Sequence, residues 1–111
     1  MTAALVLFLK LVAGHFVADY PLQTDFIANG KKRPGLYGVP WYYILSGHAA
    51  THATAVCLIT GSMVFAAWEF VSHFVIDAAK CEGIIGIHQD QWLHFLCKAT
   101  YATLMFRGVM G

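Results

Sequence analysis

The sequence predicts an all-α protein, a four-helix antiparallel bundle that spans a membrane. Of its 111 residues, 59% are hydrophobic and only 12% are charged, whereas an average soluble domain is roughly 45–50% apolar and about 25% charged. Apolar residues also fall into four long runs, and prolines, glycines and polar residues separate these runs. Lipid is the simplest solvent for such a chain, so we expect a single integral membrane domain over residues 1–111.

Each apolar run is close to the ~17–25 residues that a helix needs to cross a hydrocarbon core. Pro21 ends the first run, and a polar loop closed by Pro40 precedes the second. Gly61 leaves only a tight turn before the third run, and a glycine-bearing turn over residues 81–89 precedes the fourth. Neighbouring helices should therefore be antiparallel. The expected spans cover about residues 2–20, 41–60, 62–79 and 90–106.

Basic residues in the loops predict the orientation in the membrane. The side shared by the first and third loops carries most of them, and the opposite side has only Arg107. By the positive-inside rule the first side is cytoplasmic. We expect a multi-pass protein of the inner membrane with both termini outside the cytoplasm. The basic residues of the cytoplasmic side are Lys31, Lys32, Arg33 and Lys80.

Charge and cysteine content exclude two other classes of protein. With a net charge of +1 and one short basic run, the chain has no electrostatic footprint for nucleic acid. Its three cysteines form no C-x-x-C pair, so they indicate neither a disulfide framework nor a zinc site made of thiolates, and they should be reduced thiols.

The alternative to a membrane protein is a soluble helical bundle that buries its apolar faces against a partner.

All six histidines belong to four short signatures. Residues four apart on a helix lie on one face, so each signature presents two ligand atoms in one direction. Each pair also lies near the cytoplasmic end of its expected span, and polar groups inside a bilayer usually mark a functional site. The signatures are His15-x3-Asp19-x3-Gln23, His48-x3-His52, His73-x3-Asp77-x2-Lys80 and His88-x-Asp90-Gln91-x2-His94.

Imidazoles and carboxylates together predict a site for one or two divalent metal ions, with zinc preferred over iron or manganese. Glu69 and Lys98 continue the polar stripes toward the membrane centre, so Glu69 is either a general base or half of a buried ion pair with Lys98. We assign catalytic roles to Glu69 and Asp90. The expected metal ligands are His15, Asp19, His48, His52, His73, Asp77 and His94. Substrate contacts, or partners that orient the ligands, are expected from Gln23, Lys80, Gln91 and Lys98.

These residues predict a metal-dependent hydrolase that acts at the cytoplasmic membrane boundary on a lipid or lipid-linked substrate. The alternatives are a protein that binds or transports metal ions or protons, a haem carrier, and a structural component of a membrane complex. In the last case the polar side chains would form a hydrogen-bonded network that only holds the helices together.

The four signatures, in this order, resemble the domain of unknown function 3307 family of small bacterial and phage membrane proteins. The resemblance covers nearly the whole chain, and it implies a multi-span membrane protein but no established activity. A weaker similarity, limited to histidine and aspartate pairs at helix ends, is to bacterial membrane-bound metal-dependent hydrolases. This chain is shorter than those enzymes, so a homo-oligomer is expected to complete the site. The family pattern is matched by His15, Asp19 and Gln23 in GHFVADYPLQTDF, by Lys31 or Lys32, by His48 and His52, by His73, Asp77 and Lys80, and by Asp90, Gln91 and His94.

Overall fold

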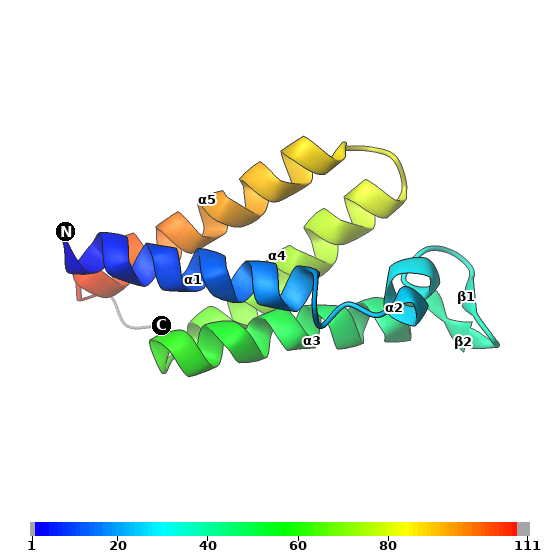
Figure 1. Cartoon of the computed structure of the whole chain (residues 1–111), viewed down its shortest axis with the longest axis horizontal. Coiled ribbons are helices and arrows are strands. Elements are labelled where there is room, and N and C mark those ends of the chain that lie inside the picture. Colours follow the sequence, from blue (N-terminus) through cyan, green and yellow to red (C-terminus); the bar gives the residue numbers. More distant parts are fainter. Residues whose placement is uncertain (1, 109–111) are drawn as a thin grey trace.

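A computed structural model describes residues 2–108, which form five helices and one short β-hairpin (Figure 1). The four long helices match the four predicted runs, so the helical bundle is confirmed. The ends of the predicted domain, residue 1 and residues 109–111, lie outside the described residues. The elements are α1 (Ala3–Asp19), α2 (Asp25–Gly30), β1 (Gly35–Leu36), β2 (Val39–Pro40), α3 (Trp41–Thr60), α4 (Met63–Cys81) and α5 (Ile87–Phe106).

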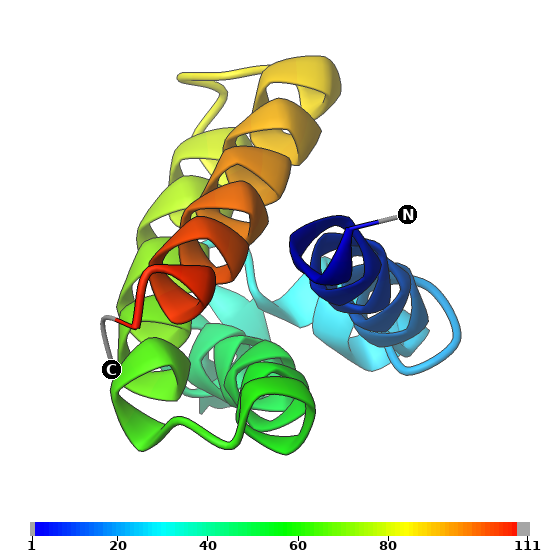
Figure 2. The same ribbon diagram turned by 90° about the vertical axis from the view of Figure 1, so that its left-hand side faces the viewer.

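The four long helices are antiparallel to their neighbours, as predicted. In Figure 1, α1 and α4 run in one direction and α3 and α5 return in the other. Helix α1 packs against α3 and α5, and α4 packs against the same two helices. The view along the bundle in Figure 2 shows the four helices around a common interior. Side chains from all four can therefore meet inside the bundle.

Local sequence explains where the long helices begin and end. Thr2 Oγ1 accepts a hydrogen bond from the backbone N–H of Leu5, and Ser62 Oγ accepts one from Phe65, each at 3.1 Å. Such side-chain caps satisfy backbone donors that a helix leaves unpaired at its start. Gly61 ends α3 in the left-handed conformation (φ 73°) that glycine adopts without strain. The predicted tight turn between the second and third runs is confirmed.

The polar loop before α3 is more ordered than the sequence indicated, and it corrects the all-α prediction. It contains α2, capped by Thr24, and a hairpin in which Gly35 pairs with Pro40. Gly35 has a φ of +118°, and a Cβ atom there would lie 2.0 Å from the carbonyl oxygen of Val39. Two-residue strands escaped prediction because they are too short to show an alternating pattern.

Within residues 2–108, no helix combines the length and the apolar character needed to cross a membrane. The four predicted spans therefore have no support in the structure. Helix α1, with 17 residues, is at the lower limit of the length needed, and α5 carries Asp90, His94 and Lys98 on a single face. The sequence prediction gave the apolar runs more weight than the ionisable residues within them.

The interior is apolar at one end of the bundle and polar at the other. Leu11, Val56, Phe65, Tyr101 and Ala102 form the apolar core. The polar part holds most of the predicted site residues, whereas large apolar side chains such as Leu58, Trp68 and Trp92 are exposed. Soluble proteins rarely bury lysine, glutamate or aspartate unless these are paired, so the polar interior needs an explanation of its own. The buried polar residues are His15, Lys31, His48, His52, Ser62, Glu69, His73, Asp77, Asp90, His94 and Lys98.

Candidate metal centre

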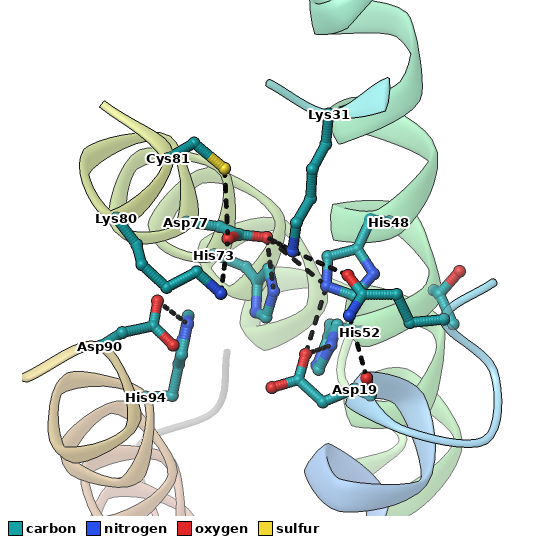
Figure 3. A network of polar contacts seen from close by, with 12 residues as sticks. Asp19, Lys31, His48, His52, His73, Asp77, Lys80, Cys81, Asp90 and His94 are labelled. Atoms are coloured by element: carbon teal, nitrogen blue, oxygen red, sulfur yellow. Dashed lines mark hydrogen bonds and ion pairs between the residues drawn. The ribbon is translucent and has the colours of Figure 1, made fainter. Parts of the chain in front are cut away.

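Five histidines from four helices meet in the polar part of the bundle, and each is only 1% exposed. We call them the histidine cluster: His15 on α1, His48 and His52 on α3, His73 on α4 and His94 on α5. The rings of His52 and His73 are stacked with centroids 3.7 Å apart, and those of His73 and His94 are 4.2 Å apart. The structure therefore brings the predicted histidines together, as the four-residue spacing indicated. Figure 3 shows most of this arrangement.

Three aspartates border the histidine cluster. Asp19 Oδ1 lies 2.9 Å from His52 Nε2 and 3.2 Å from His48 Nε2. Asp90 Oδ1 lies 3.3 Å from His94 Nε2. Asp77 Oδ2 is 3.5 Å from His48 Nε2, but its shortest contact, 2.7 Å, is with the ammonium of Lys31. Asp19 is thus the aspartate most directly engaged with the imidazoles.

Two sets of side chains are close enough to hold a metal ion. Asp19, His48, His52 and His73 offer one ligand atom each, and all four atoms lie within 4.8 Å of one another. His15, His73 and His94 form the second set by the same measure. His73 belongs to both sets and lies at the centre of the cluster.

The hydrogen bonds of two histidines determine which ring nitrogen carries a lone pair. His15 Nε2 is 3.1 Å from Gln91 Oε1, and His73 Nδ1 is 3.2 Å from Glu69 Oε2. Both oxygens are acceptors, so the histidine nitrogen must donate in each case. The second nitrogen of each neutral ring, Nδ1 of His15 and Nε2 of His73, is then an acceptor available to a metal.

These available nitrogens have no partner among the described residues. His15 Nδ1, His73 Nε2 and His94 Nδ1 are all buried without a hydrogen bond. Leaving a buried polar atom unpaired costs about 1–3 kcal/mol, so three such nitrogens in one region indicate an absent ligand. A cation bound among these histidines would satisfy such acceptor nitrogens, and imidazole nitrogen is a common ligand of zinc.

Glu69, one helical turn before His73 on α4, holds the His73 ring in place. Lys98 Nζ lies 2.7 Å from Glu69 Oε1, and the hydroxyl of Tyr101 donates to the same oxygen at 3.2 Å. Glu69 Oε2 accepts from His73. The predicted ion pair between Glu69 and Lys98 is confirmed. Tyr101 was missed, although its position three residues after Lys98 continues the stripe of Asp90, His94 and Lys98 along α5.

The other predicted site residues lie on the border of the histidine cluster. Gln91 Nε2 donates to Asp19 Oδ2 at 3.2 Å and to Asp90 Oδ2 at 2.9 Å, so it connects α1 and α5. Lys80 Nζ lies 3.3 Å from Asp77 Oδ1. Gln23 Oε1 accepts from Lys31 Nζ at 2.7 Å. All three act on aspartates or on a neighbouring lysine rather than on the ring nitrogens available to a metal.

Lys31 is the main residue that analysis of the residue spacing did not place. It follows α2, is 4% exposed, and extends its ammonium to Asp77. A lysine in a polar loop gives no periodic signal of burial, and only its place in the family pattern singled it out. His88, which fell outside the four-residue spacing, is exposed on α5 and separate from the cluster.

Burial and neighbouring charges favour the neutral form of His52 and His73 and the ionised form of Asp19. Burial lowers the pKa of His52 to about 4, despite the opposing effect of Asp19. Burial, followed by the charges of His52 and His94, also holds the pKa of His73 well below its usual value. Burial alone would raise the pKa of Asp19, but the three histidines around it lower that pKa strongly. Neutral imidazole and ionised carboxylate are the forms that bind metal.

Comparison with known proteins assigns the chain to a family. No curated protein and no solved structure matches the chain. A family model described as "Protein of unknown function (DUF3307)" matches residues 6–107. The match includes all four helices of the candidate metal centre and every site residue named above. The chain therefore belongs to this family.

Proposed function

We propose that this protein binds one divalent metal ion, zinc being the best fit, through His15, His73 and His94. The observation that carries this proposal is the set of three buried ring nitrogens without partners, one from each of these histidines. They come from three helices, so only the folded bundle assembles them. Three histidines leave the fourth position of a tetrahedral zinc site open, which is the arrangement of catalytic zinc sites.

A single ion is favoured over two because His73 is shared. Both ligand sets include this residue, and its Nδ1 is committed to Glu69 at 3.2 Å. Only Nε2 remains, and one ring nitrogen binds one ion. The other ligand set, which adds Asp19, His48 and His52 to His73, would then be an alternative position for the same single ion. A haem is disfavoured because ring centroids only 3.7 and 4.2 Å apart leave no space for a porphyrin between those rings.

A hydrolase is the activity that such a site supports best. A divalent ion held by three histidines supplies Lewis acidity, which activates water near neutral pH and polarises a phosphoryl or acyl oxygen. Asp90 is our candidate general base, because it is buried and its Oδ1 atom lies 3.3 Å from Nε2 of the proposed ligand His94. Both oxygens of Glu69 already have partners, so its role is to position His73.

The substrate and the location are part of the same proposal. The side chains of Leu58, Trp68 and Trp92 are 64–81% exposed, while charged side chains such as Glu69 and Lys98 are buried. Large exposed apolar surfaces mark contacts with membranes or protein partners. They support association with the inner membrane and a lipid or lipid-linked substrate. Sedimentation of the expressed protein with the membrane fraction tests this part, and its complete recovery in the supernatant would contradict it.

A second candidate, ion binding without hydrolysis, is favoured by the other ligand set. Asp19, His48, His52 and His73 together supply four protein ligands, and closed four-ligand shells are typical of structural zinc sites. Transport and structural roles remain within this alternative. If the ion occupies this set, Asp19→Asn should lower metal affinity more than His94→Ala does. The reverse order supports the three-histidine site.

Metal content decides the proposal. The wild type, His15→Ala and His73→Ala should be purified without a metal-affinity tag and analysed by mass spectrometry for metals, with helical content checked by circular dichroism. His88→Ala is the matched control, because His88 is exposed outside the cluster. We expect about one ion per chain in the wild type and the control, and a large loss in the other two variants. Folded wild type without metal, even after incubation with zinc, contradicts the proposal.

A further inference from the structure

A polar pocket of about 370 Å³ opens at the border of the histidine cluster. It is formed by the loop after α1, by α2 with the residues that follow it, and by the end of α4. Three of its lining residues are lysines and none is acidic. The lining residues are Gln23, Ala28, Lys31, Lys32, Lys80 and Cys81.

The lysines of this pocket outnumber the carboxylates that contact them. Lys31 and Lys80 share a single carboxylate partner, Asp77, at 2.7 and 3.3 Å. Lys32 is exposed and has no ion pair within residues 2–108. Nearby Arg33 is already paired with Glu82 at 2.6 Å. The pocket wall thus has three ammonium groups, of which two contact one carboxylate and the third contacts none, and this arrangement favours an anionic ligand.

Asp77 connects the pocket with the histidine cluster. Its Oδ2 atom accepts a hydrogen bond from Lys31 Nζ and lies 3.5 Å from His48 Nε2 and 3.9 Å from His73 Nε2. Figure 3 shows Lys31 and Lys80 reaching Asp77 from two sides, with the imidazoles directly beyond it. An anion on these lysines would therefore be separated from the cluster by one carboxylate group.

We propose that the pocket binds the phosphate group of a phosphate monoester, which deepens the proposed function by naming the substrate class of that site. A phosphate dianion matches the excess positive charge better than a carboxylate does, and lysine is a common phosphate ligand. The Gln23 side chain adds an amide at the same wall. A volume of about 370 Å³ lies at the lower end of the roughly 300–1,000 Å³ of small-molecule sites, enough for a phosphorylated head group.

The phosphate can belong to a soluble ester or to a lipid head group, and two probes separate these sources. Inorganic phosphate is titrated into the protein by calorimetry. Binding to vesicles of phosphatidylcholine with or without phosphatidic acid is measured by flotation. Phosphate binding without preference for phosphatidic acid identifies a soluble ester, whereas a preference for phosphatidic acid identifies a lipid. Either result supports the phosphate pocket only if the lysine variants described next bind the same probe more weakly than the wild type does.

The variants are Lys32→Gln and Lys80→Gln, with Lys10→Gln as the control. Lys10 is an exposed lysine of α1 outside this pocket, so its replacement causes the same change in net charge. We expect the dissociation constant of the preferred probe to rise about ten-fold in each pocket variant, as loss of one charge-assisted contact predicts. It should change less than about two-fold in the control.

Metal content, measured on every sample, separates this inference from the proposed function. Binding that is retained in metal-free protein and lost in Lys32→Gln supports the pocket even where no metal is found. Equal affinity in the wild type and both pocket variants overturns the inference, because any bound phosphate is then held elsewhere. Absence of binding by metal-loaded wild type to both probes overturns it as well.

Discussion

Replacing Lys98 by methionine should strongly destabilise the protein, because Lys98 is one half of a buried ion pair. Lys98 is 1% exposed and Glu69 is fully buried, and their charged atoms are 2.7 Å apart. Removing one partner leaves the other charge uncompensated, which costs about 3–5 kcal/mol. At about 4 °C per kcal/mol, this equals a fall in Tm of roughly 12–20 °C. Total stabilities of only about 5–15 kcal/mol make such a loss easy to measure.

The double variant Glu69→Gln/Lys98→Met tests the reasoning behind this number. Glutamine has no charge to leave unpaired, and its amide oxygen still accepts a hydrogen bond from Tyr101 or His73. We expect the double variant to be more stable than the sum of the two single losses predicts, by about 2 kcal/mol or more. Urea unfolding followed by circular dichroism measures all three variants, with exposed Lys10→Met as the control. Additive losses, or a loss below about 1 kcal/mol for Lys98→Met, would refute the reasoning.

A glycine substitution and the addition of zinc should each change the stability of the protein in a way that can be measured. Gly35→Ala should cost about 1–3 kcal/mol in urea unfolding, because its φ of +118° and the 2.0 Å approach to the Val39 oxygen exclude a Cβ atom. Gly47→Ala, inside α3 with no atom within 4 Å of its Cβ position, should cost nothing, and equal losses in both would contradict the backbone argument. Adding zinc at 100 times its Kd to chelator-treated protein should add about 2.7 kcal/mol of stability. The same addition should not raise the Tm of His73→Asn, and an equal rise there would place the ion elsewhere.

The histidine cluster could be predicted from the sequence because helical geometry is regular. Spacings of four residues, from His15 to Asp19 and from His48 to His52, set which side chains share a face. Short connections such as the turn at Gly61 then force neighbouring helices to be antiparallel, which brings distant pairs together. The same regularity made the ion pair of Glu69 and Lys98 predictable.

The residues and features that escaped prediction lack such a period. Lys31 lies in a loop, and its burial depends on where α2 directs it rather than on any pattern in the sequence. The roles of Gln91 and Glu69 depend on which oxygen meets which ring nitrogen, a matter of a few tenths of an ångström. Membrane spans were predicted from the apolar runs, but no helix within residues 2–108 has the length and apolar character to cross a membrane, and ionisable residues such as Glu69 and Lys98 interrupt two of these runs.

X-ray absorption at the edge of the bound metal tests the central claim most directly. Wild-type protein should show the multiple scattering of about three imidazoles around the ion, at the ~2.0–2.1 Å expected for zinc and nitrogen. His73→Asn should lose one imidazole or the ion itself, and His88→Asn should leave the spectrum unchanged. A wild-type shell made only of oxygen ligands, or one that His73→Asn does not alter, would contradict a metal centre built on these histidines.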